Sequence, residues 1–408
     1  MPVVAGDREL DLVLYGATGF VGKLTAEYLA RSAPADARIG LGGRSEEKLR
    51  RLRDSLGSVA SDWPLVVADS DDRDALGSMA ERTTAIATTV GPYRKYGLKL
   101  VDACASSGTH YADLTGEILF MRDTIRMFDD AARESGAKIV HNCGFDSIPF
   151  DLGVFLLHQE AGELLETTAV VRRIKGGISG GTLDSMKTGI DEVRSDRSLM
   201  KVMGDPYALS PDRSAEPDLG DESDSMGIER IDELGGWMAP FVMARINTRV
   251  VRRSNALLGH AYGKRFKYRE LMATGDGVVG RARAMAVAGG LVSLAGGLVL
   301  PPTRFVLDRV LPDPGEGPSE KTVREGFYEI EIHATAADGR RWRADVKAKG
   351  DPGYGATSVM LGEAALSLAL DSHAESGPPG VRTPATAVGG ELLRRLEAAG
   401  HRYDITRA

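Results

Sequence analysis

Cysteine is scarce in this sequence, with only Cys104 and Cys143 among 408 residues. Two cysteines cannot build a disulfide framework, and no apolar signal region precedes the first expected strand. Both absences favour the reducing cytoplasm. The net charge of -7 supplies no positive surface for nucleic acid, which excludes that class of partner.

Two common catalytic signatures are also missing. No tyrosine has a lysine four residues later, so the Tyr-x-x-x-Lys pair of short-chain dehydrogenases is absent. The seven histidines are scattered, and His141-x-Cys143 alone is too small a group for zinc, so we expect no metal. What remains is an ordinary globular composition, 42% hydrophobic and 27% charged, long enough for two to three domains.

The most informative stretch lies at residues 11–22, where an apolar run breaks into glycines and leads into a helical pattern. Gly16 permits a tight turn, Gly19 lets the backbone approach a pyrophosphate, and Gly22 lets the helix pack on its strand. A plain structural turn is the alternative. The strand before and the helix after favour a dinucleotide site.

The next strand, expected over 37–43, ends without the acidic residue that reads the ribose of NAD. Arg44 and Ser45 stand there instead, with Lys48 one turn further on. These side chains suit a 2′-phosphate, so the sequence predicts NADPH as cofactor. A solvent-facing arginine is the alternative reading.

Further strands, expected over 64–69, 84–90 and 137–143, would bring their carboxyl ends to the same edge of a parallel sheet. We therefore expect the cofactor to meet a set of residues at these strand ends, namely Gly16, Thr18, Gly19, Phe20, Val21, Gly22, Arg44, Ser45, Lys48, Asp69, Ser70, Val90, Gly91, Pro92, Gly144 and Phe145.

Hydride transfer also needs a proton source. Tyr93 and Asp146 lie in the loops nearest the expected site and are the catalytic candidates. A packing tyrosine and a turn-capping aspartate are the structural alternatives.

The pattern changes after residue 150. Strand-like runs at 170–174 and 237–251 precede a hairpin signal, in which two alternating segments flank Asp338-Gly339. The fold class expected is α/β, with a Rossmann dinucleotide-binding domain over 1–150 and a mixed α/β domain with an antiparallel sheet over 151–350. Within the latter, the acidic stretch 205–236 has the composition of a mobile surface loop.

Residues 284–303 carry no charge and are flanked by Arg281 and Arg283 on one side and Arg304 and Arg309 on the other. Their length would permit a membrane span, but four glycines, a central serine and a Pro-Pro pair weaken that reading. A helix at a lipid interface, a dimer contact and the wall of an acyl tunnel are preferred, and a buried core helix stays open.

Taken together, several motifs resemble the saccharopine dehydrogenase-like oxidoreductases, within them the actinobacterial trans-acting enoyl reductases. They are residues 14–22, 89–93, 111–117, 143–149, 176–182, 253–257 and 350–354. The resemblance implies that segment 351–408 returns to the Rossmann domain. It also implies reduction of a carbon-carbon double bond on a polyketide-derived lipid, in support of a synthase that lacks its own reductase.

On this reading the partners are a lipid or polyketide acyl substrate, carried by an acyl carrier protein, and the inner face of the plasma membrane, contacted through 284–303. A homodimer is a further expectation. Two other functions stay open. One is a saccharopine dehydrogenase-type enzyme for an amino-acid adduct, with Arg172, Arg173, Lys175 and Lys187 as carboxylate binders. The other is a non-catalytic, lipid-associated dinucleotide-binding protein.

Overall fold

The computed structural model describes residues 8–408 except 177–179, 300–302, 306–316 and 372–376. The chain forms two compact units. The first contains the chain up to Ile148 together with Gly353–Ala399, and the second contains most of Pro149–Pro352 together with Gly400–Ala408. Each unit is built on its own seven-stranded sheet.

All strand pairs in the sheet of the first unit are parallel, in the order β13-β6-β5-β4-β1-β2-β3. The order 3-2-1-4-5-6 is that of a Rossmann fold, which confirms the predicted fold class. The strands are β1 (Leu10–Tyr15), β2 (Ile39–Gly43), β3 (Leu65–Val67), β4 (Thr83–Thr88), β5 (His110–Asp113), β6 (Lys138–Val140) and β13 (Gly380–Arg382).

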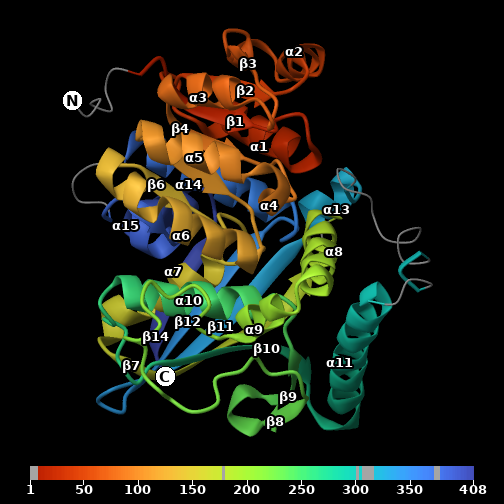
Figure 1. Ribbon diagram of the computed structural model, residues 1–408. Helices are drawn as coiled ribbons and strands as arrows, with labels where there is room; N and C mark the ends of the chain where they lie inside the picture. The colour runs from red at the N-terminus through yellow and green to blue at the C-terminus, as the bar shows by residue number, and fades with distance from the viewer. Residues whose placement is uncertain (1–7, 177–179, 300–302, 306–316, 372–376) are drawn as a thin grey trace. The chain divides into compact units, whose positions relative to one another are not determined.

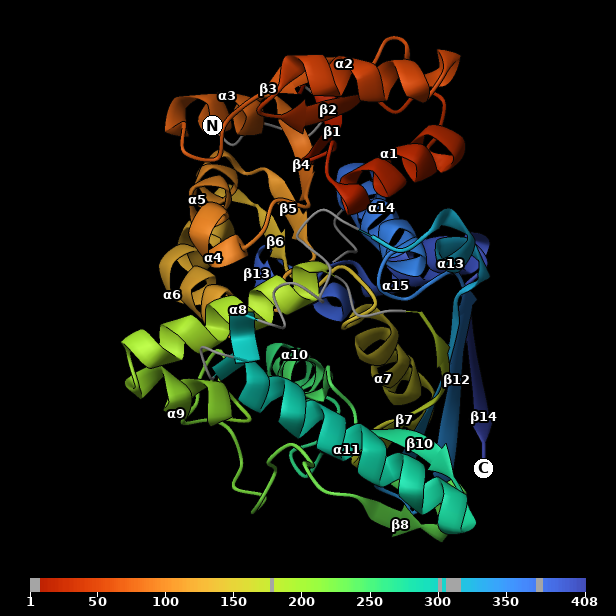
Figure 2. The ribbon, with the colours of Figure 1, turned by 90° about the vertical axis from the view of Figure 1, so that its right-hand side faces the viewer.

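Helices cover both faces of this sheet, which explains why its strands are almost continuously apolar. Figure 2 shows α5 and α6 on one side and α14 on the other. The helices of the unit are α1 (Phe20–Ser32), α2 (Glu46–Ser55), α3 (Arg73–Glu81), α4 (Tyr93–Tyr96), α5 (Leu98–Ser107), α6 (Ile118–Ser135), α14 (Gly355–Leu370) and α15 (Pro384–Ala398). The buried core joins strand residues such as Val13 and Ile86 to Val101 and Phe120 of the helices.

The returning segment both extends and covers the first sheet. β13 pairs with β6, and α14 packs against β1, β4 and β5. The sequence predicts that all of 351–408 joins the Rossmann unit, but the last residues, Gly400–Ala408, belong to the second unit. There β14 (Arg402–Arg407) pairs with β12 of the second sheet, because its backbone groups complete that sheet's edge.

The second sheet is mixed, in the order β14-β12-β11-β7-β10-β9-β8. Only β7 and β10 pair in parallel, and the other neighbours are antiparallel, which matches the predicted mixed domain. Its strands are β7 (Leu164–Lys175), β8 (Glu229–Ile231), β9 (Gly236–Pro240), β10 (Lys267–Gly275), β11 (Phe327–Ala336), β12 (Arg341–Lys349) and β14. Its helices include α7 (Ile148–Ala161), α8 (Gly180–Ser195), α9 (Ser198–Gly204), α10 (Ala244–Leu257), α11 (Gly277–Val299) and α13 (Glu320–Glu325).

The hairpin of β11 and β12 turns at Gly339, whose φ of 83° requires glycine, as its sequence signal predicted. The prediction of strand through residue 251 is wrong after Pro240, because residues 244–257 form α10. The intrinsic preference of Val250 and Val251 for strands is weak. It is outweighed by the burial of most of α10, which includes both valines.

Three buried arginines of α10 also determine the course of the acidic stretch 205–236. Arg253 donates to the carbonyl of Leu209, and Arg252 donates to that of Glu222. Arg249 forms an ion pair of 2.8 Å with Asp224. These contacts hold the stretch to α10 at three points, while most of its residues are exposed or half-buried at the surface.

Helix α11 lies at the margin of the second unit, next to β9 (Figure 1). It is the one helix among the described residues with the length and apolarity to cross a membrane, and only 11% of its most apolar window is buried. Leu298 and Ala284 are buried on one side, whereas Val278, Met285 and Val292 are exposed by 85%, 57% and 60%. This exposure opposes the reading of the described part of 284–303 as a core helix, and residues 300–302 of that segment lie outside the described residues.

Candidate dinucleotide site

The turn after β1 has the geometry that its glycines predicted. Gly16 has a φ of 83°, and its N–H donates to the carbonyl of Gly42. A Cβ at Gly22 would lie 2.2 Å from the carbonyl oxygen of Gly16, so any side chain there would separate α1 from β1. Gly16 and Gly22 thus serve the turn and the packing.

Gly19 differs from its two neighbours in the motif. It is exposed, and the nearest atom to a Cβ built on it is the Gly16 oxygen at 3.4 Å. As the residue that caps α1 it supplies no side chain to the first N–H groups of the helix. Thr18, Phe20 and Val21 around it are partly exposed. These orphan N–H groups and the helix dipole are the components of a phosphate site.

The carboxyl end of β2 presents a positive side chain. Arg44 is exposed and, within the described part of the chain, forms no ion pair or hydrogen bond. Ser45 caps α2, because its hydroxyl accepts from the N–H of Lys48, whose side chain is exposed. Among the described residues, the side chains of Arg44 and Lys48 both lack a hydrogen bond or ion pair, so both positive charges are open to a bound anion such as a 2′-phosphate.

The end of β3 lies beside Arg44. Asp69 is exposed and its carboxylate accepts from the N–H of Asp71, which shapes the turn, and Ser70 is partly exposed. Burial, and then the charge of Asp69, raises the pKa of Tyr15 to about 12, while Arg44 acts in the opposite direction. Both side chains therefore lie near the end of β1, on the side where a Rossmann fold holds adenosine.

The end of β4 is joined to the glycine turn. The hydroxyl of Thr89 donates to the carbonyl of Gly16 over 3.0 Å, and Val90, Gly91 and Pro92 follow with partly or fully exposed surfaces. These loops flank the point at which the strand order reverses. A dinucleotide lies across such a point, so they are suitably placed for its central phosphates and nicotinamide.

Tyr93 opens α4 directly after this loop and is buried. Its hydroxyl donates to the carbonyl of Thr88 and accepts from the N–H of Leu114, each over 3.3 Å. Burial raises the pKa of Tyr93 well above its ordinary value. The hydroxyl thus has two protein partners, as a packing tyrosine would.

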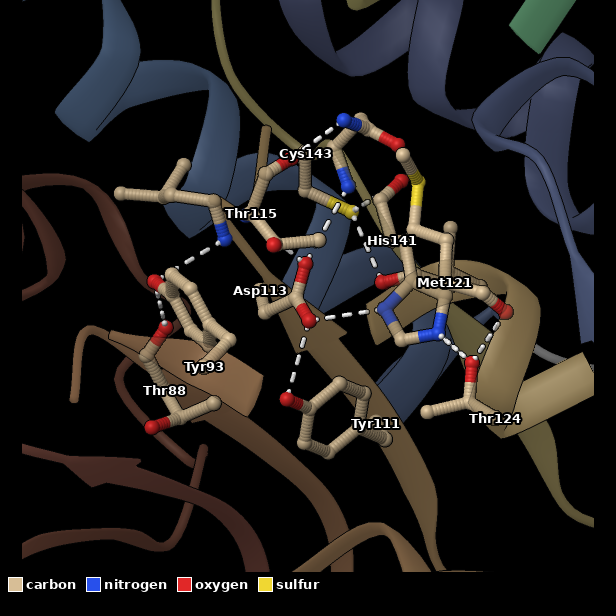
Figure 3. A network of polar contacts seen from close by, with 12 residues as sticks. Thr88, Tyr93, Tyr111, Asp113, Thr115, Met121, Thr124, His141 and Cys143 are labelled. Carbon is tan, nitrogen blue, oxygen red and sulfur yellow. Dashed lines mark hydrogen bonds and ion pairs between the residues drawn. The ribbon is translucent and has the colours of Figure 1, made fainter. Parts of the chain in front are cut away.

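A buried polar network lies at the ends of β5 and β6 (Figure 3). The Asp113 carboxylate contacts Nδ1 of His141 at 2.7 Å and accepts from the hydroxyl of Tyr111 at 2.9 Å. Nε2 of His141 lies 2.8 Å from the hydroxyl of Thr124 on α6. Our prediction omitted Asp113 and His141, although each directly follows or ends an apolar strand. That position was the available signal.

The loop after β6 contains Gly144, Phe145 and Asp146. A Cβ on Gly144 would lie 2.9 Å from the side chain of Leu114, and the N–H of Phe145 donates to Thr357. Gly144 and Phe145 are both buried, so in this structure they contribute to packing and do not present a surface to the cofactor.

Asp146 is different. It is partly exposed and makes no hydrogen bond or ion pair with the residues that the structure describes. The surrounding protein nevertheless raises its pKa from 3.8 to about 6 by removing water. A carboxylic acid with this pKa is half protonated near pH 6, so a minor fraction of it still carries a proton at neutral pH.

No group of three or more His, Cys, Asp or Glu side chains suited to a metal ion occurs among the described residues. The candidate site therefore consists of backbone N–H groups, Arg44, and the loops after β4, β5 and β6.

Comparisons with known proteins identify the cofactor domain and the family. Residues 12–140 match the saccharopine dehydrogenase NADP-binding domain. A trans-acting enoyl reductase of Mycobacterium ulcerans is 46% identical over 419 residues, covering 99% of each chain. One of Mycobacterium bovis is 45% identical, covering 98% of this chain and 99% of its own. A Mycobacterium tuberculosis protein is 49% identical over 99% of each chain, and its name assigns the same activity provisionally.

The fold has a counterpart among solved structures. Saccharopine dehydrogenase (L-Glu forming) from Saccharomyces cerevisiae, in its apo form, superposes with a TM-score of 0.53 at 13% identity. The match covers 97% of this chain and 99% of the yeast chain. At this identity the likeness concerns the fold alone. Full-length identity of 45% and above places the chain in a family: it is an NADPH-dependent oxidoreductase of the trans-acting enoyl reductase family, built on a saccharopine dehydrogenase-like fold.

Proposed function

We propose that this chain reduces the carbon-carbon double bond of an enoyl thioester, with Asp146 as the proton donor. Bound NADPH supplies the hydride. The hydride adds to the β-carbon, the proton adds to the α-carbon, and the products are the saturated acyl group and NADP⁺. Asp146 is the observation that supports this mechanism, because it combines a raised pKa, partial exposure and the absence of a described partner.

Of the two catalytic candidates, Asp146 suits proton donation better than Tyr93. A general acid works best when its pKa lies near the working pH, and about 6 meets that condition. The Tyr93 hydroxyl already donates to a carbonyl, and its raised pKa makes it a weaker acid. Tyr93 is better suited to supporting the loop that ends in Pro92.

The proposed substrate is a lipid or polyketide acyl chain on an acyl carrier protein. We further propose that the protein is cytoplasmic and contacts the inner face of the membrane through α11. Its exposed Val278 and Met285 support this, as do Arg281 and Arg283, which are exposed beside the apolar surface and suit anionic headgroups or an acidic carrier. A homodimer contact through the same surface is the competing proposal.

The amino-acid alternative has less support. It requires basic side chains free to bind carboxylates, but Arg172 pairs with Glu331, Arg173 with Glu329 and Lys175 with Glu325. Lys187 also has an interaction in the structure. These charges already have protein partners, which weakens the case for a substrate with several carboxylates.

Loss of NADPH absorbance on mixing the protein with enoyl thioesters of increasing chain length tests the proposal. We expect turnover that becomes more efficient as the chain lengthens. Turnover of saccharopine without turnover of any enoyl thioester would support the amino-acid alternative. Tight NADPH binding without any turnover would support the non-catalytic one.

A further inference from the structure

We propose that Asp113 is a positioning residue that fixes the loop carrying Asp146, and that Glu117 separately fixes the loop carrying Gly91 and Pro92. Both side chains are buried, with exposures of 0% and 8%. They bound the short link between β5 and α6, in the middle of the site. The inference rests on the proposed function, since it assigns these residues to proton delivery and to cofactor binding.

Asp113 holds the loop after β6 at three consecutive residues. One carboxylate oxygen accepts from the N–H of Asn142 at 3.2 Å, and the other contacts His141 at 2.7 Å. The carbonyl of Asp113 accepts from the N–H of Cys143 at 2.7 Å. A buried carboxylate needs such partners, and each of these bonds places the loop relative to β5.

Asn142 adds a second connection. Its backbone has a φ of 60°, which non-glycine residues seldom adopt, and its side-chain amide donates to the carbonyl of Thr115. Thr115 in turn donates its N–H to the first oxygen of Asp113 at 3.0 Å. The loops after β5 and β6 are therefore tied to each other and to one carboxylate.

The position of Asp146 follows from that of the tied residues. The N–H groups of Ser147 and Ile148 both donate to the carbonyl of Gly144, which closes a turn around Asp146. Gly144 directly follows Cys143, whose N–H is bound by Asp113. A shift at Asp113 would therefore be passed along the backbone to the proposed proton donor.

Glu117 acts on the opposite loop. Its two oxygens accept from the N–H groups of Tyr93, at 2.8 Å, and Arg94, at 2.9 Å. Pro92, the residue that caps α4, supplies no side-chain hydrogen bond, so Glu117 takes over that function. Because Gly91 and Pro92 immediately precede these N–H groups, Glu117 holds the loop expected to contact the cofactor.

Substitutions at the two carboxylates should therefore change different quantities: kcat for Asp113, and the Kd of NADPH for Glu117. Asn142→Gly removes the tie to Thr115 while keeping a residue that accepts a positive φ, and Asp113→Asn removes a charged acceptor. We expect both to lower kcat roughly 10- to 100-fold, as misplacement of a reacting group does, with the Kd of NADPH within about twofold. Glu117→Gln should raise the Kd of NADPH about tenfold and leave kcat at saturation less affected.

Three measurements test this on the full chain: the Kd of NADPH by fluorescence, kcat with an enoyl thioester, and the titration of Asp146 by carboxyl NMR, assigned with Asp146→Asn. The Asp146 midpoint should move in Asn142→Gly and Asp113→Asn but not in Glu117→Gln. A purely structural role would change the Kd and kcat together in all three variants, which would overturn the proposal. An unmoved Asp146 midpoint in folded Asn142→Gly would also overturn it, even if Asp113→Asn does not fold.

The outcome is separable from that of the proposed function. If the parent protein reduces no enoyl thioester, the proposed reaction is wrong. The Asp146 titration and the Kd of NADPH still decide whether Asp113 and Glu117 act on separate loops.

Discussion

The carboxyl ends of the parallel strands in the first unit form one edge of the sheet, here called the cofactor edge. Its two halves differ in how they are built. At the ends of β2 and β3, exposed side chains such as Arg44 and Asp69 face solvent and depend on residues close in sequence. At the ends of β4, β5 and β6, the organising groups are buried carboxylates, Asp113 and Glu117, that bind the backbone of other loops. The first half presents exposed side chains, whereas the second consists of loops bound by buried carboxylates.

This difference fits the demands of the reaction. A 2′-phosphate is held by charge, and an arginine on a flexible stem can reach it from a range of positions. Proton transfer requires the donor within hydrogen-bond reach of the acceptor, so its loop must be held more rigidly. The predictions below separate these two modes, starting with the largest effect.

Removing the proposed proton donor should have the largest effect. Asp146→Asn should lower kcat about 10²- to 10⁴-fold, the contribution typical of a general acid, with little change in the Kd of NADPH. Steady-state kinetics with fluorescence titration measures both. Tyr93→Phe is the control, because it keeps the ring while removing the competing hydroxyl. A larger loss of kcat in Tyr93→Phe than in Asp146→Asn would reverse the assignment.

Asp146→Asn should also change how the melting temperature depends on pH. The folded-state pKa of Asp146 is raised from 3.8 to about 6, so its contribution to stability is present below pH 3.8 and is lost as pH rises through about 6. Asp146→Asn should therefore raise the melting temperature relative to the parent above pH 6, with a smaller difference in acid. Because Asp146 loses its proton as the pH rises, kcat of the parent should also fall above about pH 6. Thermal melts over this range, and a pH profile of kcat, check both.

The second prediction concerns the glycine turn between the two halves. Gly19→Ala should weaken NADPH binding roughly 10- to 100-fold while the melting temperature is retained, because its Cβ would enter the space open to phosphate. Gly22→Ala, with its Cβ 2.2 Å from the Gly16 oxygen, should lower the melting temperature even without cofactor. Equal melting and equal NADPH affinity in both variants would contradict this division.

The third prediction tests the binding half alone. Arg44→Asp should shift the preference for NADPH over NADH by at least about tenfold, because it removes charge-assisted hydrogen bonds to the 2′-phosphate. Arg51→Asp, on the exposed surface of α2 and paired with Glu47, is the matched control for charge. If both variants shift the preference equally, the effect is long-range electrostatics and not a contact of Arg44.

What the sequence predicts and what it omits follow the same division. Glycine spacing is a local signal, so the turn after β1 could be predicted from the sequence. The missing acidic residue after β2 is also a local signal, and it makes Arg44 the predicted contact for a 2′-phosphate. Asp113 joins His141 and Asn142 across strands, a relation that exists only once β5 and β6 are paired. The Rossmann order was predictable because each strand and helix carries its own periodicity, whereas cross-strand hydrogen bonds carry none.

Helices α10 and α11 of the second unit show that amino-acid composition alone does not predict which helix is buried. The charged sequence of α10 is buried, with Arg249 exposed by only 2%, because its guanidinium finds Asp224 and the carbonyl of Met203. The apolar sequence of α11 is largely exposed, with Val292 at 60%. Burial depends on partners brought together by the fold, so neither outcome follows from the helix alone.

The smallest expected effect concerns the exposed surface of α11. Met285 and Val292 are seven residues apart, and so lie on the same side of the helix, two turns from each other. Burying such a side chain contributes about 1.5 kcal/mol or more, so Val292→Asp should weaken binding to anionic vesicles roughly tenfold. NADPH affinity should not change, because the cofactor edge belongs to the first unit.

Vesicle sedimentation of Val292→Asp against Val59→Asp provides the measurement. Val59 is also exposed, by 66%, but lies in the first unit, so its substitution controls for the loss of any surface valine. Sedimentation should fall further with salt, since Arg281 and Arg283 would contribute through anionic headgroups. If Val292→Asp instead converts a dimer to a monomer and leaves vesicle binding unchanged, α11 is a subunit contact, because an apolar surface of this kind is satisfied by a second copy as well as by lipid.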